Sequence, residues 1–187
     1  MADDSSGHLI SVEKENSQPE QNAIKAPEPQ KNGSEKNWPF LGFVGSYPHS
    51  IDAKGRMIIP AAVREALGER FAVAPSPDFQ AVALYPIADW IAKRDELAEL
   101  VRRKPVAQPI LDMFTKYSYI DCEADAQGRL LLPQRIRAWR LGDARDVEVN
   151  GTYNPIRIIP AAVGKEQDRL FDEKYPDPLA FLTSLQD

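Results

Sequence analysis

A nine-residue motif occurs twice in this chain, and the repeat constrains the fold more than any other feature. The segment Asp52–Pro60 reads DAKGRMIIP, and the segment Asp125–Pro133, which begins 73 residues later, reads DAQGRLLLP. Asp, Ala, Gly, Arg and Pro stand at the same places, and three apolar residues precede each proline. Further on, residues 84–86 (LYP) correspond to residues 158–160 (IIP) at an offset of 74. Because repetition at a fixed offset marks a duplicated supersecondary unit, we expect two copies of one structure.

Each copy of the motif predicts a tight hairpin turn. Asp52 and Gly55 stand at the first and fourth positions of the first turn, and Asp125 and Gly128 stand at those of the second. An aspartate at the first position can accept a hydrogen bond from a backbone N–H two residues on, and glycine adopts the positive φ that closes a type I turn with a bulge. We therefore interpret all four as residues that hold the turns.

Strands and helices are expected at matching places in the two copies. Proline is favoured where a helix begins and glycine where it ends, so Pro60 and Gly68 bracket one short helix, and Pro133 and Gly142 bracket another. The expected strands are 47–51, 56–59, 71–74 and 81–85 in copy one, and 119–124, 129–132, 146–150 and 156–159 in copy two. Further helices are expected over 87–103, 108–117 and 161–171, with a terminal turn or two over 179–185. The predicted fold class is α+β.

The N-terminal segment has a different composition from the rest. Residues 1–37 carry only eight apolar side chains, diluted in polar residues and proline. Such a segment cannot bury enough surface to offset the entropy of ordering it. We expect a disordered tail over residues 1–38. Its seven acidic and four basic side chains supply three of the five net negative charges of the chain, so the remainder is close to neutral.

Composition also excludes several classes of protein. Cys122 is the one cysteine, and His8 and His49 are the two histidines, so we expect neither a disulfide framework nor a metal site. Catalysis by a cysteine–histidine or serine–histidine pair needs a histidine near the nucleophile, and the chain has almost none to offer. We therefore predict no catalytic residue, no cofactor and no small-molecule substrate. No apolar run is long enough for a signal peptide or a membrane helix. We therefore expect a cytoplasmic protein without membrane contact.

The first turn carries the most suggestive cations. Lys54 and Arg56 flank Gly55 in a rigid hairpin, from which side chains can project toward a duplex. Arginine can bind guanine with two hydrogen bonds or clamp a phosphate, whereas lysine behaves as a point charge. The alternative is that Arg56 pairs with Asp52 across the turn and is purely structural.

The second turn is similar but less cationic. Arg129 corresponds to Arg56, but Gln127 stands where copy one has Lys54, so it can donate hydrogen bonds to DNA without adding charge. Whether both hairpins contact DNA stays open on these residues. Asp125, like its counterpart, is assigned to the turn because phosphate repels a carboxylate. Four helical arginines either extend a basic face or are ordinary solvated residues: Arg64, Arg135, Arg137 and Arg140.

The doubled motif, the Leu-Tyr-Pro segment at 84–86 and Trp90 four residues after it resemble the MraZ family over about residues 40–180. These are bacterial transcriptional regulators with two tandem SpoVT-AbrB-type half-domains. The resemblance implies two pseudo-repeated half-domains that form a swapped-hairpin β-barrel with flanking helices. It also implies assembly into rings and binding of double-stranded DNA at short direct promoter repeats.

The resemblance also implies an organisation and a set of DNA contacts. The first half-domain with its helix would span 40–103, a connecting helix 104–118, the second half-domain 119–175 and a C-terminal segment 176–187. The DNA-contacting motif of the family falls on Asp52, Lys54 and Arg56 in copy one, and on Asp125 and Arg129 in copy two, with Gln127 at the departing position.

We therefore expect a nucleoid-associated transcriptional regulator of the division and cell-wall gene cluster and of its own promoter. Each subunit offers few cations, so affinity would come from a homo-oligomer whose hairpins engage repeated sites together. The alternative is an AbrB-type protein-interaction module, such as an antitoxin that neutralises a partner protein.

Overall fold

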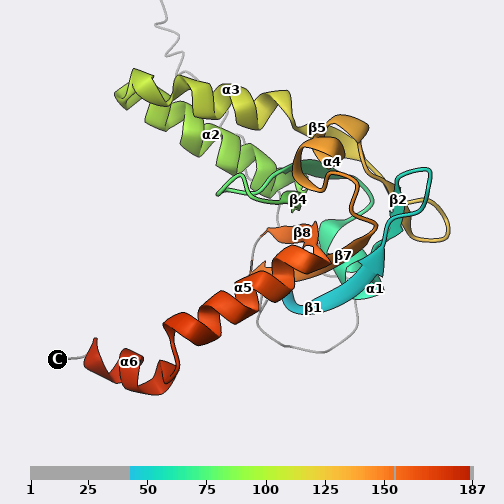
Figure 1. The fold of residues 1–187 in the computed structure, drawn as a ribbon. Helices are drawn as coiled ribbons and strands as arrows, with labels where there is room; N and C mark the ends of the chain where they lie inside the picture. Colours follow the sequence, from blue (N-terminus) through green and yellow to red (C-terminus); the bar gives the residue numbers. More distant parts are fainter. Residues whose placement is uncertain (1–42, 154, 186–187) are drawn as a thin grey trace, which may run out of the picture. The chain divides into compact units, whose positions relative to one another are not determined.

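The computed structural model describes residues 43–153 and 155–185 (Figure 1). The tail expected over residues 1–38 lies outside these residues. Within them, no helix is both long and apolar enough to cross a membrane.

The described residues form eight strands and six α-helices in the order that the repeat predicts. The strands are β1 (Phe43–Ser50), β2 (Arg56–Ile58), β3 (Phe71–Pro75), β4 (Val82–Pro86), β5 (Tyr119–Cys122), β6 (Arg129–Leu131), β7 (Asp146–Tyr153) and β8 (Ile156–Pro160). The helices are α1 (Ala61–Leu67), α2 (Ile87–Arg103), α3 (Gln108–Lys116), α4 (Gln134–Arg140), α5 (Ala161–Lys174) and α6 (Pro178–Ser184), with a 3-10 turn η1 (Pro105–Ala107) before α3. The α+β class is confirmed.

β1, β7 and α5 are each three residues longer than predicted, and the C-terminal turns predicted over 179–185 form one residue earlier. β1 begins at Phe43, four residues before the expected start, because it pairs with β7 along its whole length, from Phe43 opposite Tyr153 to Ser50 opposite Asp146. The C-terminal segment forms α6, whose first turn is capped by Asp177: its carboxylate accepts a hydrogen bond of 2.9 Å from the backbone N–H of Ala180.

The main sheet is antiparallel and contains strands of both copies. Its order is β1-β7-β8-β4-β3-β5, with β4 and β8 paired at the centre. The first strand of each copy pairs with the other copy: β1 with β7, and β5 with β3. β2 and β6 pair only with each other, as a two-stranded antiparallel ribbon. The two copies therefore share both sheets.

The expectation of a closed β-barrel is wrong for the described strands. Closure requires hydrogen bonding from strand to strand around a complete circle. Here β1 and β5 are the edges of the six-stranded sheet, and the ribbon is a separate sheet. β2 and β6, which have three residues each, pair only with each other and do not connect those edges.

The core lies on both faces of the main sheet. On one face the ribbon contributes Met57 and Leu130, each 2% exposed, which join buried residues of α1, α4 and the sheet in one cluster. On the other face α2 and α3 cover small alanines of β3 and β4, and Trp90 stacks on Phe114 with ring centroids 6.2 Å apart. Since the larger cluster contains residues of both copies, neither copy buries its apolar surface alone.

Candidate nucleic-acid interface

The first hairpin tip, Asp52–Arg56, is held by its aspartate. One carboxylate oxygen of Asp52 accepts hydrogen bonds from the backbone N–H groups of Lys54 (2.8 Å) and Arg56 (2.9 Å). The other oxygen accepts from Nε and Nη2 of Arg56, both at 2.8 Å. Gly55 closes the turn with φ of +83° and donates its N–H to the carbonyl of Asp52 at 2.9 Å. The tip is thus rigid, and Lys54 stays exposed at its apex.

These bonds stabilise the ionised form of the carboxylate. Donation from the backbone N–H of Arg56 is the main reason why the pKa of Asp52 falls to about 2. Asp52 therefore stays charged at neutral pH and keeps Arg56 oriented.

The second tip, Asp125–Arg129, has the same construction with one addition. Asp125 accepts from the backbone N–H groups of Gln127 and Arg129, each at 2.9 Å, and from Nε of Arg129 at 2.8 Å. The backbone bond from Arg129 lowers the pKa of this carboxyl also. In addition, Nη2 of Arg129 donates to the side-chain oxygen of Gln127 at 3.0 Å. The guanidinium of copy two therefore has one more intramolecular partner than that of copy one.

The ribbon presents an alternating outer face. Arg56 lies opposite Leu131, and Ile58 lies opposite Arg129. Met57 is buried between its neighbours, whereas Ile58 is 53% exposed and Leu131 is 60% exposed. Successive residues of a strand point to opposite faces, so the two arginines and two apolar side chains share the outward face.

The two tips stand at opposite ends of this ribbon. A backbone hydrogen bond joins the turn glycine of each tip to a residue of the other copy. The N–H of Leu132 donates to the carbonyl of Gly55 (3.0 Å), and the N–H of Ile59 donates to that of Gly128 (2.9 Å). Gly55 and Ile59 are four residues apart, so the two turns lie about 13 Å apart along the ribbon at the usual strand rise.

An arginine of the opposite copy packs on each turn glycine. A Cβ atom built on Gly55 would lie 2.3 Å from Nη1 of Arg137, which belongs to α4. A Cβ atom built on Gly128 would lie 2.8 Å from Cζ of Arg64, which belongs to α1. Both glycines are buried, so close approach of a guanidinium, as well as positive φ, favours glycine there.

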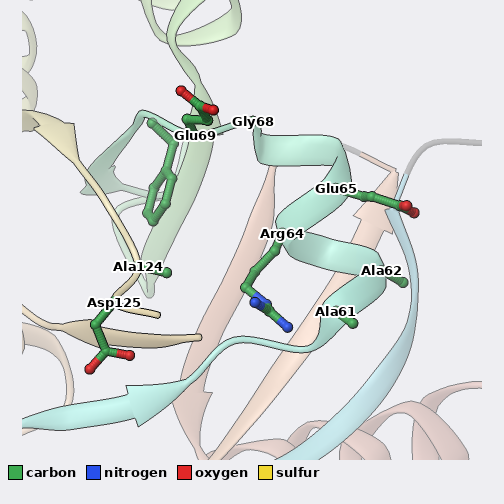
Figure 2. A pocket seen from close by; sticks show the side chains of 9 residues that line it. Ala61, Ala62, Arg64, Glu65, Gly68, Glu69, Ala124 and Asp125 are labelled. Carbon is green, nitrogen blue, oxygen red and sulfur yellow. The ribbon is translucent and has the colours of Figure 1, made fainter. Parts of the chain in front are cut away.

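Each of these contacts borders an open cleft between a turn and a helix. The α1 cleft, of 660 Å³, is lined by Ala61, Ala62, Arg64, Glu65, Gly68, Glu69, Phe71, Ala124 and Asp125. Figure 2 shows Arg64 and Asp125 on opposite sides of it. The α4 cleft, of 340 Å³, is lined by Ile51, Asp52, Ala53, Arg137, Gly142, Asp143, Ala144 and Arg145. Six lining residues of one cleft correspond to six of the other at offsets of 73 and 74, so the clefts are equivalent places in the two copies.

Comparison with known proteins identifies the family. A family profile described as "MraZ protein, putative antitoxin-like" matches residues 43–112. A "Transcriptional regulator MraZ" of Desulfitobacterium hafniense (strain Y51) is 34% identical over 146 residues, which are 76% of this chain and 98% of that protein. One of Symbiobacterium thermophilum is 34% identical over 134 residues, 72% of this chain and 95% of its own length.

This chain belongs to the MraZ family. The family profile covers copy one with α2, whereas the full-length MraZ relatives extend the match over most of the described residues. Both hairpin tips thus lie in a chain related to MraZ over nearly the whole length of those relatives.

The structure brings the expected tip residues of this MraZ-family chain together, and it adds two that the sequence interpretation left open. Lys54 and Arg56 share one tip, and Gln127 and Arg129 share the other. Arg64 and Arg137, which could equally have been solvated helix residues, each lie on the turn of the opposite copy. Val63-Arg64 and Ile136-Arg137 correspond at the repeat offset of 73, which is the sequence signal that could have distinguished them from Arg135 and Arg140.

Other chemistry has little support at these sites. Among the described residues, no three histidine, cysteine or acidic side chains gather in a way that could hold a metal ion. Cys122 is half-buried, and this burial raises the pKa of its thiol, which disfavours the reactive thiolate.

Proposed function

We propose that this protein is a transcriptional regulator that binds double-stranded DNA with the outer face of the β2–β6 ribbon and its two tips. The observation that carries the proposal is the outward pair of arginines, Arg56 and Arg129, each held in a rigid turn by an ionised aspartate. Membership of a family whose named relatives are transcriptional regulators supports it.

The ribbon suits DNA in shape and chemistry. The major groove admits a two-stranded β-ribbon, arginine reads guanine, and apolar side chains contact the methyl group of thymine. Ile58 and Leu131 stand beside the two arginines and are available for such contacts. Contact with thymine would explain why these apolar side chains are exposed next to arginines. A hairpin with a purely structural role would not need them there.

Pairing with aspartate and binding to DNA are compatible for Arg56. A guanidinium has five N–H donors. Asp52 engages only Nε and Nη2, so Nη1 remains for a base edge or a phosphate. The two interpretations of Arg56, turn residue or DNA contact, therefore combine: the aspartate orients the arginine that meets the duplex.

The organisation of the chain follows the repeat in this proposal. The half-domains are 40–103 and 119–175, joined by 104–118 and followed by 176–187. Pairing of β1 with β7 and of β5 with β3 supports an exchange of hairpins between them. The DNA target is short direct repeats in the protein's own promoter, upstream of the division and cell-wall gene cluster, and the protein acts in the cytoplasm at the nucleoid.

Binding is by a homo-oligomer, ring-shaped in this proposal. Two tips per subunit offer few cations to the duplex, and linking subunits raises avidity without any new chemistry. The C-terminal helices offer a surface for assembly. Phe171, Tyr175, Pro178, Phe181 and Leu182 line an apolar groove of 310 Å³, and Phe171 and Leu182 are each more than half exposed.

The antitoxin-like function is the second candidate, and the family description favours keeping it. It requires a protein partner instead of DNA. A small toxin gene beside this one would favour it, whereas methyltransferase and peptidoglycan-synthesis genes directly downstream would favour DNA binding.

The experiment is a gel-shift titration with the duplex upstream of the protein's own gene. We expect Arg56→Ala to lower the affinity at least about fivefold, since a two-bond base contact contributes about 1–3 kcal/mol. Arg169→Ala is the matched control, because Arg169 lies on α5 and pairs there with Glu166 and Glu173. Equal affinities of the Arg56→Ala variant and the unmodified protein would count against the proposal.

A further inference from the structure

We infer that the two hairpin tips are not equivalent: the copy-one tip engages DNA phosphates together with Arg137 and Arg145 of copy two, whereas the copy-two tip does not gain such support. This inference rests on the proposed function, DNA binding, and assigns the phosphate contacts to particular side chains. It starts from the two clefts, which occupy equivalent places but carry different charges.

The α4 cleft beside the copy-one tip is the more cationic of the two. Arg137 and Arg145 line it, against the carboxylates of Asp52 and Asp143. Asp52 is already bound to Arg56, so one free carboxylate faces two arginines. Within the described part of the chain, neither Arg137 nor Arg145 forms an ion pair with another side chain.

The α1 cleft beside the copy-two tip has the opposite balance. Arg64 lines it with Glu65, Glu69 and Asp125. Asp125 is bound to Arg129, which leaves two glutamates against one arginine. A phosphate placed there would meet repulsion from both glutamates.

Two positions of the repeat produce the difference: Glu65 corresponds to Ala138, and Phe71 corresponds to Arg145. Arg145 comes three residues after Gly142, and Phe71 comes three residues after Gly68. Phe71 is buried in the core, whereas Arg145 is exposed. The backbone carbonyl of Arg145 accepts from the N–H of Ile51 at 2.7 Å, which fixes the arginine next to the start of the copy-one turn.

The tips also differ in charge, and the copy-one tip is again the more positive. Copy one has Lys54 at the apex, and copy two has Gln127. The side-chain oxygen of Gln127 also accepts a hydrogen bond from Nη2 of Arg129, so it is already engaged within its own tip. Charge at the apex and charge in the cleft both favour the copy-one tip.

The experiment compares glutamine substitutions in matched pairs, by fluorescence anisotropy with the upstream duplex between about 50 and 200 mM salt. Arg145→Gln is compared with Arg70→Gln, because Arg70 is an exposed arginine two residues after Gly68 that pairs with Asp121 and does not line the α1 cleft. Arg137→Gln is paired with Arg64→Gln, since both arginines pack on a turn glycine in the same way. Circular dichroism melting checks that each variant is folded.

We expect Arg145→Gln and Arg137→Gln each to lower the affinity about eightfold at 0.1 M salt per engaged subunit, and to reduce the salt slope by about 0.9 for each phosphate that the variant no longer neutralises. Arg70→Gln and Arg64→Gln should change both quantities little. Glu69→Gln should raise the affinity, because it removes repulsion beside the copy-two tip.

Equal effects within each pair would overturn the inference, because the tips would then be equivalent, while the proposed function would stand. If the unmodified protein does not bind the duplex at all, the proposed function fails and the inference fails with it.

Discussion

Replacing Gly55 by alanine tests the contact between the two copies at the first tip. Gly142 is the reference: its φ is +56°, and a Cβ atom there would meet nothing within 4 Å. Gly142→Ala therefore introduces only backbone strain, about 1–2 kcal/mol for a left-handed residue. Gly55→Ala has comparable strain at φ of +83°, and its Cβ would also lie 2.3 Å from Nη1 of Arg137. Because the guanidinium can swing aside, we expect its displacement to add about 0.5–1 kcal/mol, at the lower end of couplings between contacting residues.

A double-mutant cycle isolates that addition. The free energy of unfolding is measured in urea for Gly55→Ala, Arg137→Ala and the double variant, at one protein concentration. In the Arg137→Ala background the cost of Gly55→Ala should fall to that of Gly142→Ala, while the cost of Gly142→Ala should stay the same in both backgrounds. If Gly55→Ala costs the same in both backgrounds within about 0.3 kcal/mol, Arg137 does not pack on that turn and our assignment is wrong.

Three further predictions address the core, the turn and the assembly. Ile136→Ala should lower the free energy of unfolding by about 2–5 kcal/mol in a urea titration, because Ile136 is fully buried in the core shared by both copies; a decrease under about 1 kcal/mol would contradict that packing. Because the pKa of Asp52 is lowered to about 2, its stabilisation of the turn is complete above the ordinary aspartate pKa and is lost only as pH falls through about 2; carboxyl NMR should give a midpoint near 2, and one near the ordinary aspartate value would refute the hydrogen bonding. Phe181→Ser should reduce the oligomer mass in light scattering without changing circular dichroism, because Phe181 is 43% exposed in the apolar groove; an unchanged mass would exclude that groove from assembly.

Local patterns were enough to predict most of the elements. The motif around Gly55 and that around Gly128 predicted the two turns, since aspartate and glycine at those positions favour one turn geometry. Helices after Pro60 and Pro133 followed from proline at the first helical position. These predictions depend on residues close in the chain, and they agree with the structure to within a few residues at the element ends.

Pairing between the copies could not be predicted in this way. Nothing near β1 indicates that its partner is β7, about a hundred residues later, because strand pairing is decided by packing of the whole sheet. The separation of the β2–β6 ribbon from the main sheet, in place of a closed barrel, has the same origin. The repeat offset did align Arg64 with Arg137, but only the pairing of the copies brings each of them onto the opposite turn.

Hydrogen exchange with and without the upstream duplex tests the central claim most directly. The claim is that the ribbon and its tips are the surface that meets DNA. We predict that added duplex slows exchange at residues 52–58 and 125–131, more strongly at the former, and leaves α5 unchanged. Protection confined to the helices, with both tips exchanging as they do in the free protein, would contradict the account.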